Sequence, residues 1–144
     1  MSAQSSTNVM DAWIQASLQG LIKFTREEMQ AYRLYTVVPR LVGFIEELTN
    51  WYVRLNRNRL KDIDNVDDCK TALSTLYFVL LSMAQLMSPL TPFFTEYQYK
   101  QLRKIHPDAE NPDVAIDALG RAESVHYTMI PEPDMVPYLC QSDV

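Results

Sequence analysis

The spacing of apolar and polar positions predicts a first helix over residues 9–32. Apolar side chains recur there at largely helical intervals. They are Val9, Trp13, Leu18, Leu21, Ile22, Phe24, Met29 and Tyr32. Asn8 suits the N-cap, and Asp11 suits the first turn because a carboxylate favours the positive end of the helix dipole.

Two stripes predict a second helix of about 25 residues, roughly 37 Å long at 1.5 Å per residue. Thr36 is the expected cap, and Pro39 falls in the first turn, where a missing N–H costs little. The apolar stripe comprises Val38, Leu41, Ile45, Leu48, Tyr52 and Leu55. The polar stripe comprises Arg40, Gly43, Glu47, Asn50, Arg54, Arg57 and Lys61. Its C-terminal part, with Arg59 added, is named the cationic stripe: Arg54, Arg57, Arg59 and Lys61.

Two further helices follow an acidic break. Residues 67–88 are apolar nearly all round and should form the most buried helix. Thr91 and Pro92 are the expected cap and first residue of a fourth helix, which closes with Arg103 and Lys104 near the negative end of its dipole.

The pattern weakens after His106. A short helical turn at 113–119 and an extended segment at 124–130 lying across the bundle are expected. The predicted fold class is therefore all-α, a four-helix-type bundle over residues 8–132 with an irregular C-terminal tail. Residues 1–7 would be a lead or linker and residues 133–144 a tail.

Charge is divided unevenly along the chain. Residues 1–61 carry eight Lys or Arg against five acids, a formal charge of +3, whereas residues 62–144 carry −8. Local field rather than the net charge of −5 decides where an anion settles. An anion should meet the first half, and the acidic remainder is expected to face away from it.

Familiar catalytic and metal-binding patterns are not found. The three glycines are isolated, so no phosphate-cradling loop is expected. His106 and His126 lack spaced carboxylate or cysteine partners, and Cys69 and Cys140 are read as reduced structural thiols. The acids of 62–68 lack the glycine and final glutamate of a calcium loop. No catalytic residue, metal site or cofactor of this domain is predicted.

No secretory signal pattern begins the sequence, and the longest apolar stretch, residues 76–87, is too short to span a bilayer. A soluble intracellular protein without a membrane partner is expected.

The cationic stripe has two possible roles. It could neutralise a nucleic-acid backbone, with Arg40 adding charge, Asn50 reading a base edge and Trp51 stacking on an unpaired base. It could equally be a solvated helix face, with Trp51 and Tyr52 turned inward. The spacing alone leaves both open.

Four segments resemble one family in the same order along the chain. They read NVMDAWI at 8–14, AYRLYTVVPRLVGFIEELTNWYVRLNRNRLKD at 31–62, MSPLTPFFTEYQY at 87–99 and SVHYTMIP at 124–131. They are similar to the anticodon-binding domain of eukaryotic cytosolic-type isoleucyl-tRNA synthetases, which are class I enzymes. The string TNWYVR followed by an Arg-rich turn is the part that separates these enzymes from their valine and leucine relatives.

The resemblance implies a helical bundle that grips the anticodon stem and loop of isoleucine tRNA in the cytoplasm. It also implies a separate catalytic domain that uses ATP and magnesium, and further C-terminal domains, as partners within the parent enzyme. Neither the HIGH-type nor the KMSKS-type signature of that catalytic domain occurs in this sequence, so this chain should be inactive alone. The alternative is a helical protein-interaction module with no RNA role; an independent enzyme is the least supported possibility.

Overall fold

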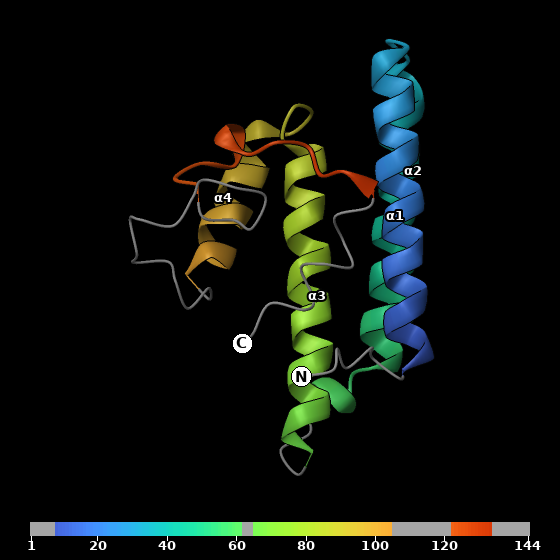
Figure 1. The fold of residues 1–144 in the computed structure, drawn as a ribbon, viewed down its shortest axis with the longest axis vertical. Coiled ribbons are helices and arrows are strands. Elements are labelled where there is room, and N and C mark those ends of the chain that lie inside the picture. Colours follow the sequence, from blue (N-terminus) through green and yellow to red (C-terminus); the bar gives the residue numbers. More distant parts are fainter. Residues whose placement is uncertain (1–7, 62–64, 105–121, 134–144) are drawn as a thin grey trace.

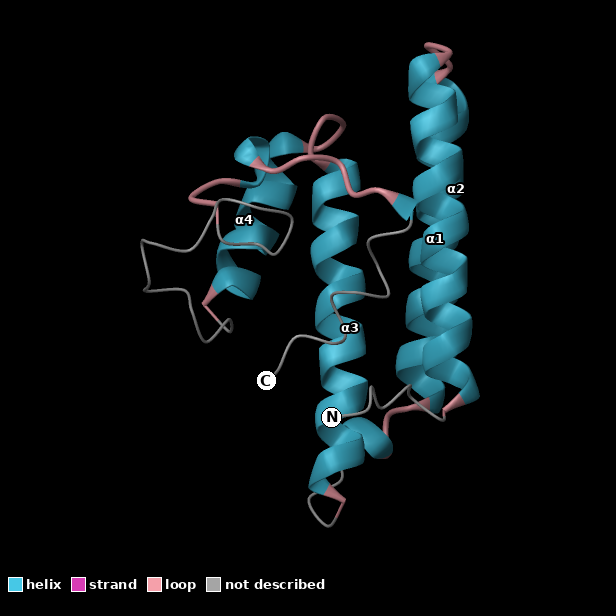
Figure 2. Cartoon of the chain, in the orientation of Figure 1, coloured by secondary structure: helices cyan, strands magenta, loops and turns pink. Residues whose placement is uncertain are grey.

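The computed structural model of the chain describes residues 8–61, 65–104 and 122–133. Helices are the only regular elements in these ranges (Figure 2), which confirms the all-α prediction. They are α1 (Val9–Gln30), α2 (Leu34–Glu47), the π-helix η1 (Leu48–Val53), the 3₁₀ turn η2 (Arg59–Lys61), α3 (Val66–Met87), α4 (Pro92–Arg103) and the 3₁₀ turn η3 (Val125–Tyr127). The predicted turn at 113–119 lies outside the described residues, as do residues 1–7 and 134–144.

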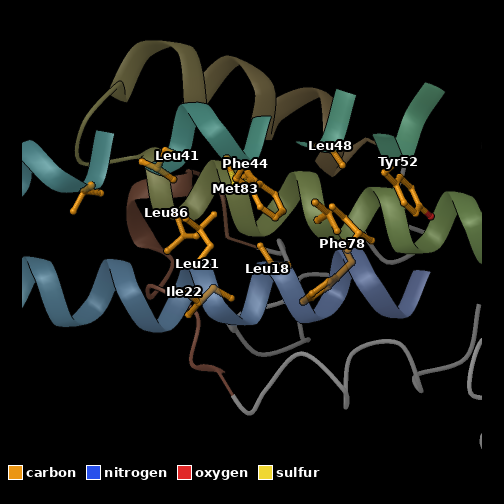
Figure 3. Close-up of a cluster of buried hydrophobic side chains, with 13 residues drawn as sticks. Leu18, Leu21, Ile22, Leu41, Phe44, Leu48, Tyr52, Phe78, Met83 and Leu86 are labelled. Atoms are coloured by element: carbon orange, nitrogen blue, oxygen red, sulfur yellow. The ribbon is translucent and has the colours of Figure 1, made fainter. Parts of the chain in front are cut away.

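The helices pack in a row (Figure 1). α1 and α2 form a hairpin, α3 packs against it, and α4 packs on the other side of α3. A first core fills the space between the hairpin and α3 (Figure 3). A second, smaller core lies between α3, α4 and η3. The described part of the chain therefore builds two adjacent cores that share α3.

α3 is the central helix, as its apolar sequence predicts. Ten of its 22 residues are buried, more than in any other described helix. By length and composition alone α3 could also cross a membrane, because the helix extends beyond the apolar stretch at 76–87. However, 56% of its most apolar window is buried within the protein, and core helices of globular proteins pass the same test.

The buried stripes differ in detail from the predicted ones. In α1 the stripe includes Ile14, whereas Val9 and Trp13 are exposed, and so is Tyr32, which lies beyond the end of α1 at Gln30. In α2 and η1 the buried positions are Val37, Leu41, Phe44, Leu48 and Tyr52, whereas Val38, Ile45 and Leu55 are exposed. Residues 41, 48 and 52 belong to both the predicted and the buried stripe. Helical spacing is compatible with burial of either Val37 and Phe44 or Val38 and Ile45 next to them. Packing against α1 and α3 decides which pair is buried.

Helix starts are partly as predicted. Asn8 caps α1, because its Oδ1 accepts a hydrogen bond from the Met10 N–H at 2.9 Å, and Thr91 occupies the N-cap of α4. The prediction that Thr36 caps the second helix is wrong, since α2 begins at Leu34 with Arg33 as N-cap. Pro39 consequently lies inside the helix, beyond its first turn.

A network of polar side chains ties the turn between α1 and α2. Arg33 donates Nε to Glu28 Oε2 at 2.8 Å and Nη2 to Glu28 Oε1, and Thr36 Oγ1 donates to Glu28 Oε2 at 2.6 Å. The hydrogen bonds from Arg33 and Thr36 lower the pKa of Glu28 from 4.5 to about 2.

Glu28 should therefore make stability depend on acid pH. Its folded pKa is depressed, so its stabilisation is complete above about pH 4.5 and is lost as pH falls towards 2. Thermal melts between pH 7 and 2 should show that Glu28→Gln lowers the melting temperature at neutral pH and that this difference shrinks through that window. A difference that stays constant with pH would contradict the assignment.

Residues 122–133, named the C-terminal strap, cross the end of α3 from α4 to α1 (Figure 1). Tyr99 Oη donates to the Ala122 carbonyl at 2.8 Å, and Arg26 Nη1 donates to the Ile130 carbonyl at 3.1 Å. The predicted crossing of the bundle by residues 124–130 is confirmed. The predicted extended conformation is wrong at η3, where Ser124 Oγ accepts from the His126 N–H at 3.3 Å and starts a 3₁₀ turn.

Candidate nucleic-acid interface

The second helix changes its winding where the exposed Asn and Trp occur. The six residues LTNWYV form the π-helix η1 as a direct continuation of α2. Thr49 Oγ1 donates to the Ile45 and Glu46 carbonyls at 2.8 and 3.3 Å, so this side chain also bonds the preceding turn. π-helical segments occur frequently at functional sites. η1 buries Leu48 and Tyr52 and exposes Asn50 and Trp51, the latter by 58%.

A buried hydrogen-bond network fixes η1 to α1 and α3. Tyr52 is fully buried, and its hydroxyl donates to Asp11 Oδ1 at 2.7 Å and to the Ala72 carbonyl at 3.3 Å. Figure 3 shows Tyr52 at the edge of the first core. Burial raises the pKa of the Tyr52 hydroxyl, and its hydrogen bond to Asp11 raises it further. The phenol therefore remains a neutral donor at physiological pH.

Arg59 belongs to this network, contrary to the prediction that it lies bare on the cationic stripe. Its Nη1 and Nη2 donate to the two carboxylate oxygens of buried Asp11, both at 2.8 Å. Its Nε and Nη2 donate to Asp68, both at 2.6 Å. The side chain is only 11% exposed. The hydrogen bonds to Asp11, and then those to Asp68, raise the pKa of Arg59, so it stays charged and bound to these carboxylates.

Arg59 thus joins three elements, with Asp11 in the first turn of α1 and Asp68 in the first turn of α3. Asn56 closes the same turn, because its Nδ2 donates to the Tyr52 carbonyl at 2.9 Å and its carbonyl accepts from the Leu60 N–H at 2.8 Å. These contacts hold the backbone at Asn56 and Leu60, which lie on either side of Arg57, and Leu60 directly precedes Lys61.

Arg59→Lys should lower thermal stability and leave the salt dependence of RNA binding almost unchanged. Stability should fall because a lysine ammonium cannot reproduce the planar donor fork with which Arg59 binds both carboxylates. Salt dependence should stay because the positive charge at this position is buried and does not contact a phosphate. Thermal melts and the salt dependence of RNA binding measure the two effects. A marked fall in salt dependence at unchanged stability would show that Arg59 does contact RNA.

Three members of the cationic stripe remain exposed. Arg54, Arg57 and Lys61 are exposed side chains, and no carboxylate within residues 8–61, 65–104 and 122–133 forms an ion pair with them. Asn50 and Trp51 lie in η1, which runs directly into Arg54, whereas Arg57 lies in the turn that follows and Lys61 at the end of η2. These five residues, Asn50, Trp51, Arg54, Arg57 and Lys61, are named the cationic end.

Arg40 does not lie at the cationic end. It precedes Arg54 by 14 residues of helix, roughly 20 Å along the axis. Its Nη1 lies 3.9 Å from Glu47 Oε1, and Glu47 Oε2 accepts from Ser17 Oγ at 2.9 Å. With 45% of its side chain exposed, Arg40 could still meet a long ligand, but it is partly neutralised.

Part of the acidic segment, residues 62–144, lies close to the cationic stripe, although it was expected to face away from it. Asp68 lies beside the η2 turn because it binds Arg59, and Asp67 is exposed in the same first turn of α3. Asp67 would repel a phosphate placed there. The accessible approach is therefore along η1 and the turn after it.

The remaining candidate groups do not assemble into a reactive site. His126 is exposed in η3, and Cys69 Sγ lies 3.6 Å from the Leu60 carbonyl oxygen, to which it donates. Among the residues that the structure describes, no three His, Cys, Asp or Glu side chains gather as metal ligands. The geometry therefore offers a surface of cations, an amide and an aromatic ring.

Sequence reasoning placed Tyr52 on the apolar stripe and Asp11 in the first turn of the first helix, but it missed that Asp11, Tyr52 and Asp68 join in one network with Arg59. A signal was present for Asp11, because it lies three residues before Ile14 and seven before Leu18 on the buried stripe of α1. A carboxylate on a buried stripe needs a partner, although the sequence does not say which cation supplies it.

Comparisons with known proteins agree with this geometry. A family described as the anticodon-binding domain of tRNA ligase matches residues 11–142. The chain is 56% identical over 131 residues to a probable cytoplasmic isoleucine–tRNA ligase of Dictyostelium discoideum, covering 91% of this chain and 11% of that protein. It is 53% identical to the cytoplasmic isoleucine–tRNA ligase of Arabidopsis thaliana (88% and 10% covered) and 50% identical to that of Mus musculus (89% and 10% covered).

The chain thus spans about a tenth of the length of these curated relatives. The family match covers nearly the whole bundle, including both cores and the cationic end. The chain therefore belongs to the family of anticodon-binding domains of tRNA ligases.

Proposed function

We propose that this chain binds the anticodon stem and loop of isoleucine tRNA and positions that tRNA for aminoacylation by a catalytic domain elsewhere in a cytoplasmic ligase. The observation that carries the proposal is the cationic end: three exposed cations with no described carboxylate partner, beside an exposed tryptophan and asparagine. The relatives named isoleucine–tRNA ligase support the choice of tRNA.

Each group has a role that follows from its chemistry. Arg54, Arg57 and Lys61 would neutralise phosphates of the stem and release counterions. Trp51 would stack on an unpaired loop base, and Asn50 would hydrogen-bond a base edge, because RNA is read mainly at unpaired bases. Arg59 would not touch RNA and would instead hold the turn that presents Arg57 and Lys61.

The fixed backbone matters for affinity. Because the Asp11–Arg59–Asp68 network already orders the turn, less conformational freedom is lost when RNA binds. ATP and magnesium would be bound by the catalytic domain of the ligase rather than by this domain.

Tryptophan fluorescence provides a direct test. The chain has two tryptophans, Trp13 and Trp51, so Trp13→Phe leaves Trp51 as the single reporter. Isoleucine tRNA should quench Trp51 in this variant, whereas an unrelated tRNA should do so only at higher concentration. The reverse variant, Trp51→Phe, is the control and should show little quenching. Equal responses to both tRNAs would reject selective recognition, and no response would reject the proposed role of Trp51.

A further inference from the structure

The π-helix η1 changes which residues of the second helix face the core. Leu41 and Leu48 are buried and lie seven residues apart, a step that returns to within about 20° of the same direction on an α-helix. The same step continued from Leu48 leads to Leu55. However, Leu55 is 61% exposed, and its polar neighbour Asn56 is buried instead.

The winding of η1 accounts for this exchange. Hydrogen bonds in a π-helix run from residue i to i+5 rather than to i+4, so the turn accommodates one extra residue. Side chains after the turn are therefore displaced around the helix axis by about one position. Asn56 faces the core in the direction that Leu55 would otherwise take, and Leu55 faces solvent.

Polar contacts hold this shifted arrangement in place. The Tyr52 hydroxyl donates to buried Asp11 at 2.7 Å, and Asn56 Nδ2 donates to the Tyr52 carbonyl at 2.9 Å. These bonds satisfy the buried amide, but the arrangement still forgoes the burial of a leucine, which would stabilise the fold. An arrangement that leaves Leu55 in solvent while a polar residue occupies the core is typical of a functional segment.

Leu55 lies on the same side of the helix as Trp51. The two residues are four apart, the spacing at which helical side chains are neighbours, and both are more than half exposed. Arg54 lies directly before Leu55 and is exposed, and no carboxylate within the described parts of the chain forms an ion pair with it. An aromatic ring, an aliphatic side chain and a cation therefore share one surface.

We propose that Leu55 is a further RNA-contacting residue, which together with Trp51 forms a slot for one unpaired base of the anticodon loop. The inference rests on the proposed function for the RNA itself. A base that stacks with one face on the Trp51 ring would have its other side covered by Leu55, as bases held between aromatic and apolar side chains are. Arg54 favours RNA as the occupant, because its charge would meet a phosphate next to that base.

Binding of the anticodon stem-loop of isoleucine tRNA to the 144-residue chain tests the slot. Leu55→Ala should weaken binding about 5- to 10-fold. The dependence of affinity on salt concentration should stay the same, because no charge is removed. Leu34→Ala is the matched control, since Leu34 is a 48% exposed leucine at the start of α2, and it should bind like the unmodified chain. Equal affinities of the two variants would overturn the inference.

Abasic nucleotides show whether Trp51 and Leu55 hold the same base. Each base of the loop is removed in turn, and the affinities of the unmodified chain, Trp51→Ala and Leu55→Ala are compared. At one loop position, removal of the base should weaken binding to the unmodified chain and abolish the further loss caused by either substitution. If the two substitutions lose their effects at different positions, no shared slot exists and the inference is overturned.

Thermal melts separate an RNA contact from a structural role. Leu55→Ala should change the melting temperature by less than about 2 °C, because the side chain faces solvent. Asn56→Ala should lower it by roughly 3 to 6 °C, because this substitution removes a buried hydrogen bond. If Leu55→Ala is as destabilising as Asn56→Ala, Leu55 packs in the core and the inference is overturned.

Failure of the proposed function would look different. If Leu55→Ala binds normally while Trp51→Ala and the combined replacement of Arg54, Arg57 and Lys61 by alanine both bind weakly, only the slot is rejected. If none of these variants weakens binding, the proposed function is rejected together with the slot.

Discussion

Asp11→Ala is expected to destabilise the chain by about 3 to 5 kcal/mol, because it leaves a largely buried arginine without its main partner. Asp11 is fully buried and accepts two hydrogen bonds from Arg59 and one from Tyr52. Asp68 cannot replace it, since Asp68 already binds Arg59 from the other side. A loss of this size is a large share of the roughly 5 to 15 kcal/mol that stabilises a typical domain.

Urea denaturation of three variants measures this effect. Tyr52→Phe removes the hydroxyl that donates to Asp11 and to the Ala72 carbonyl and should cost about 1 to 2 kcal/mol. Asp67→Ala is the matched control, because it removes an exposed acid from the first turn of α3 and should cost less than about 1 kcal/mol. If Asp11→Ala is no more destabilising than Asp67→Ala, the buried network does not hold the cationic end.

Combined replacement of Arg54, Arg57 and Lys61 by alanine should weaken binding of isoleucine tRNA roughly 100-fold at 0.15 M salt. Each neutralised phosphate contributes about 0.7 to 0.9 to the salt slope, which corresponds to roughly 4- to 5-fold in affinity at this salt concentration. The fold should be unaffected, because all three side chains are exposed. Fluorescence anisotropy of labelled tRNA gives the affinities, and circular dichroism melts give the stability.

Three exposed cations away from the cationic end provide the control. Lys23, Lys100 and Lys104 are exposed on α1, α4 and the residue after α4, and their combined replacement removes the same formal charge. This control should weaken binding only slightly through long-range attraction. Equal losses for the two triple variants would mean that net charge, rather than the cationic end, determines affinity.

The fold was predictable because helix formation depends on local spacing. The apolar run of α3, the Asn8 cap and the Thr91–Pro92 start each carry a local signal, and each lies where it was predicted. The exposure of Val38 and Ile45 was not predictable in the same way. Two neighbouring apolar residues of a helix fit the same helical spacing almost equally well. Which of the two is buried depends on where α1 and α3 lie.

The cationic stripe shows the same limit at the site. Arg57, Arg59 and Lys61 are alike in sequence, yet Arg59 is buried against Asp11, 48 residues away, and Asp68. Such pairing depends on how α1 and α3 meet the η2 turn and is not visible in local spacing. The π-helix was also missed, because a widened turn leaves the 3- and 4-residue apolar pattern around Leu48 and Tyr52 intact.

The salt dependence of tRNA binding tests the central claim most directly. For the unmodified chain, the logarithm of the association constant should fall with the logarithm of salt concentration with a slope of about −2 to −3, as expected for three phosphate contacts. The Arg54, Arg57 and Lys61 triple variant should lose most of this slope, while the Lys23, Lys100 and Lys104 control keeps it. A slope that is the same in all three proteins would contradict the assignment of the cationic end as the RNA-binding surface.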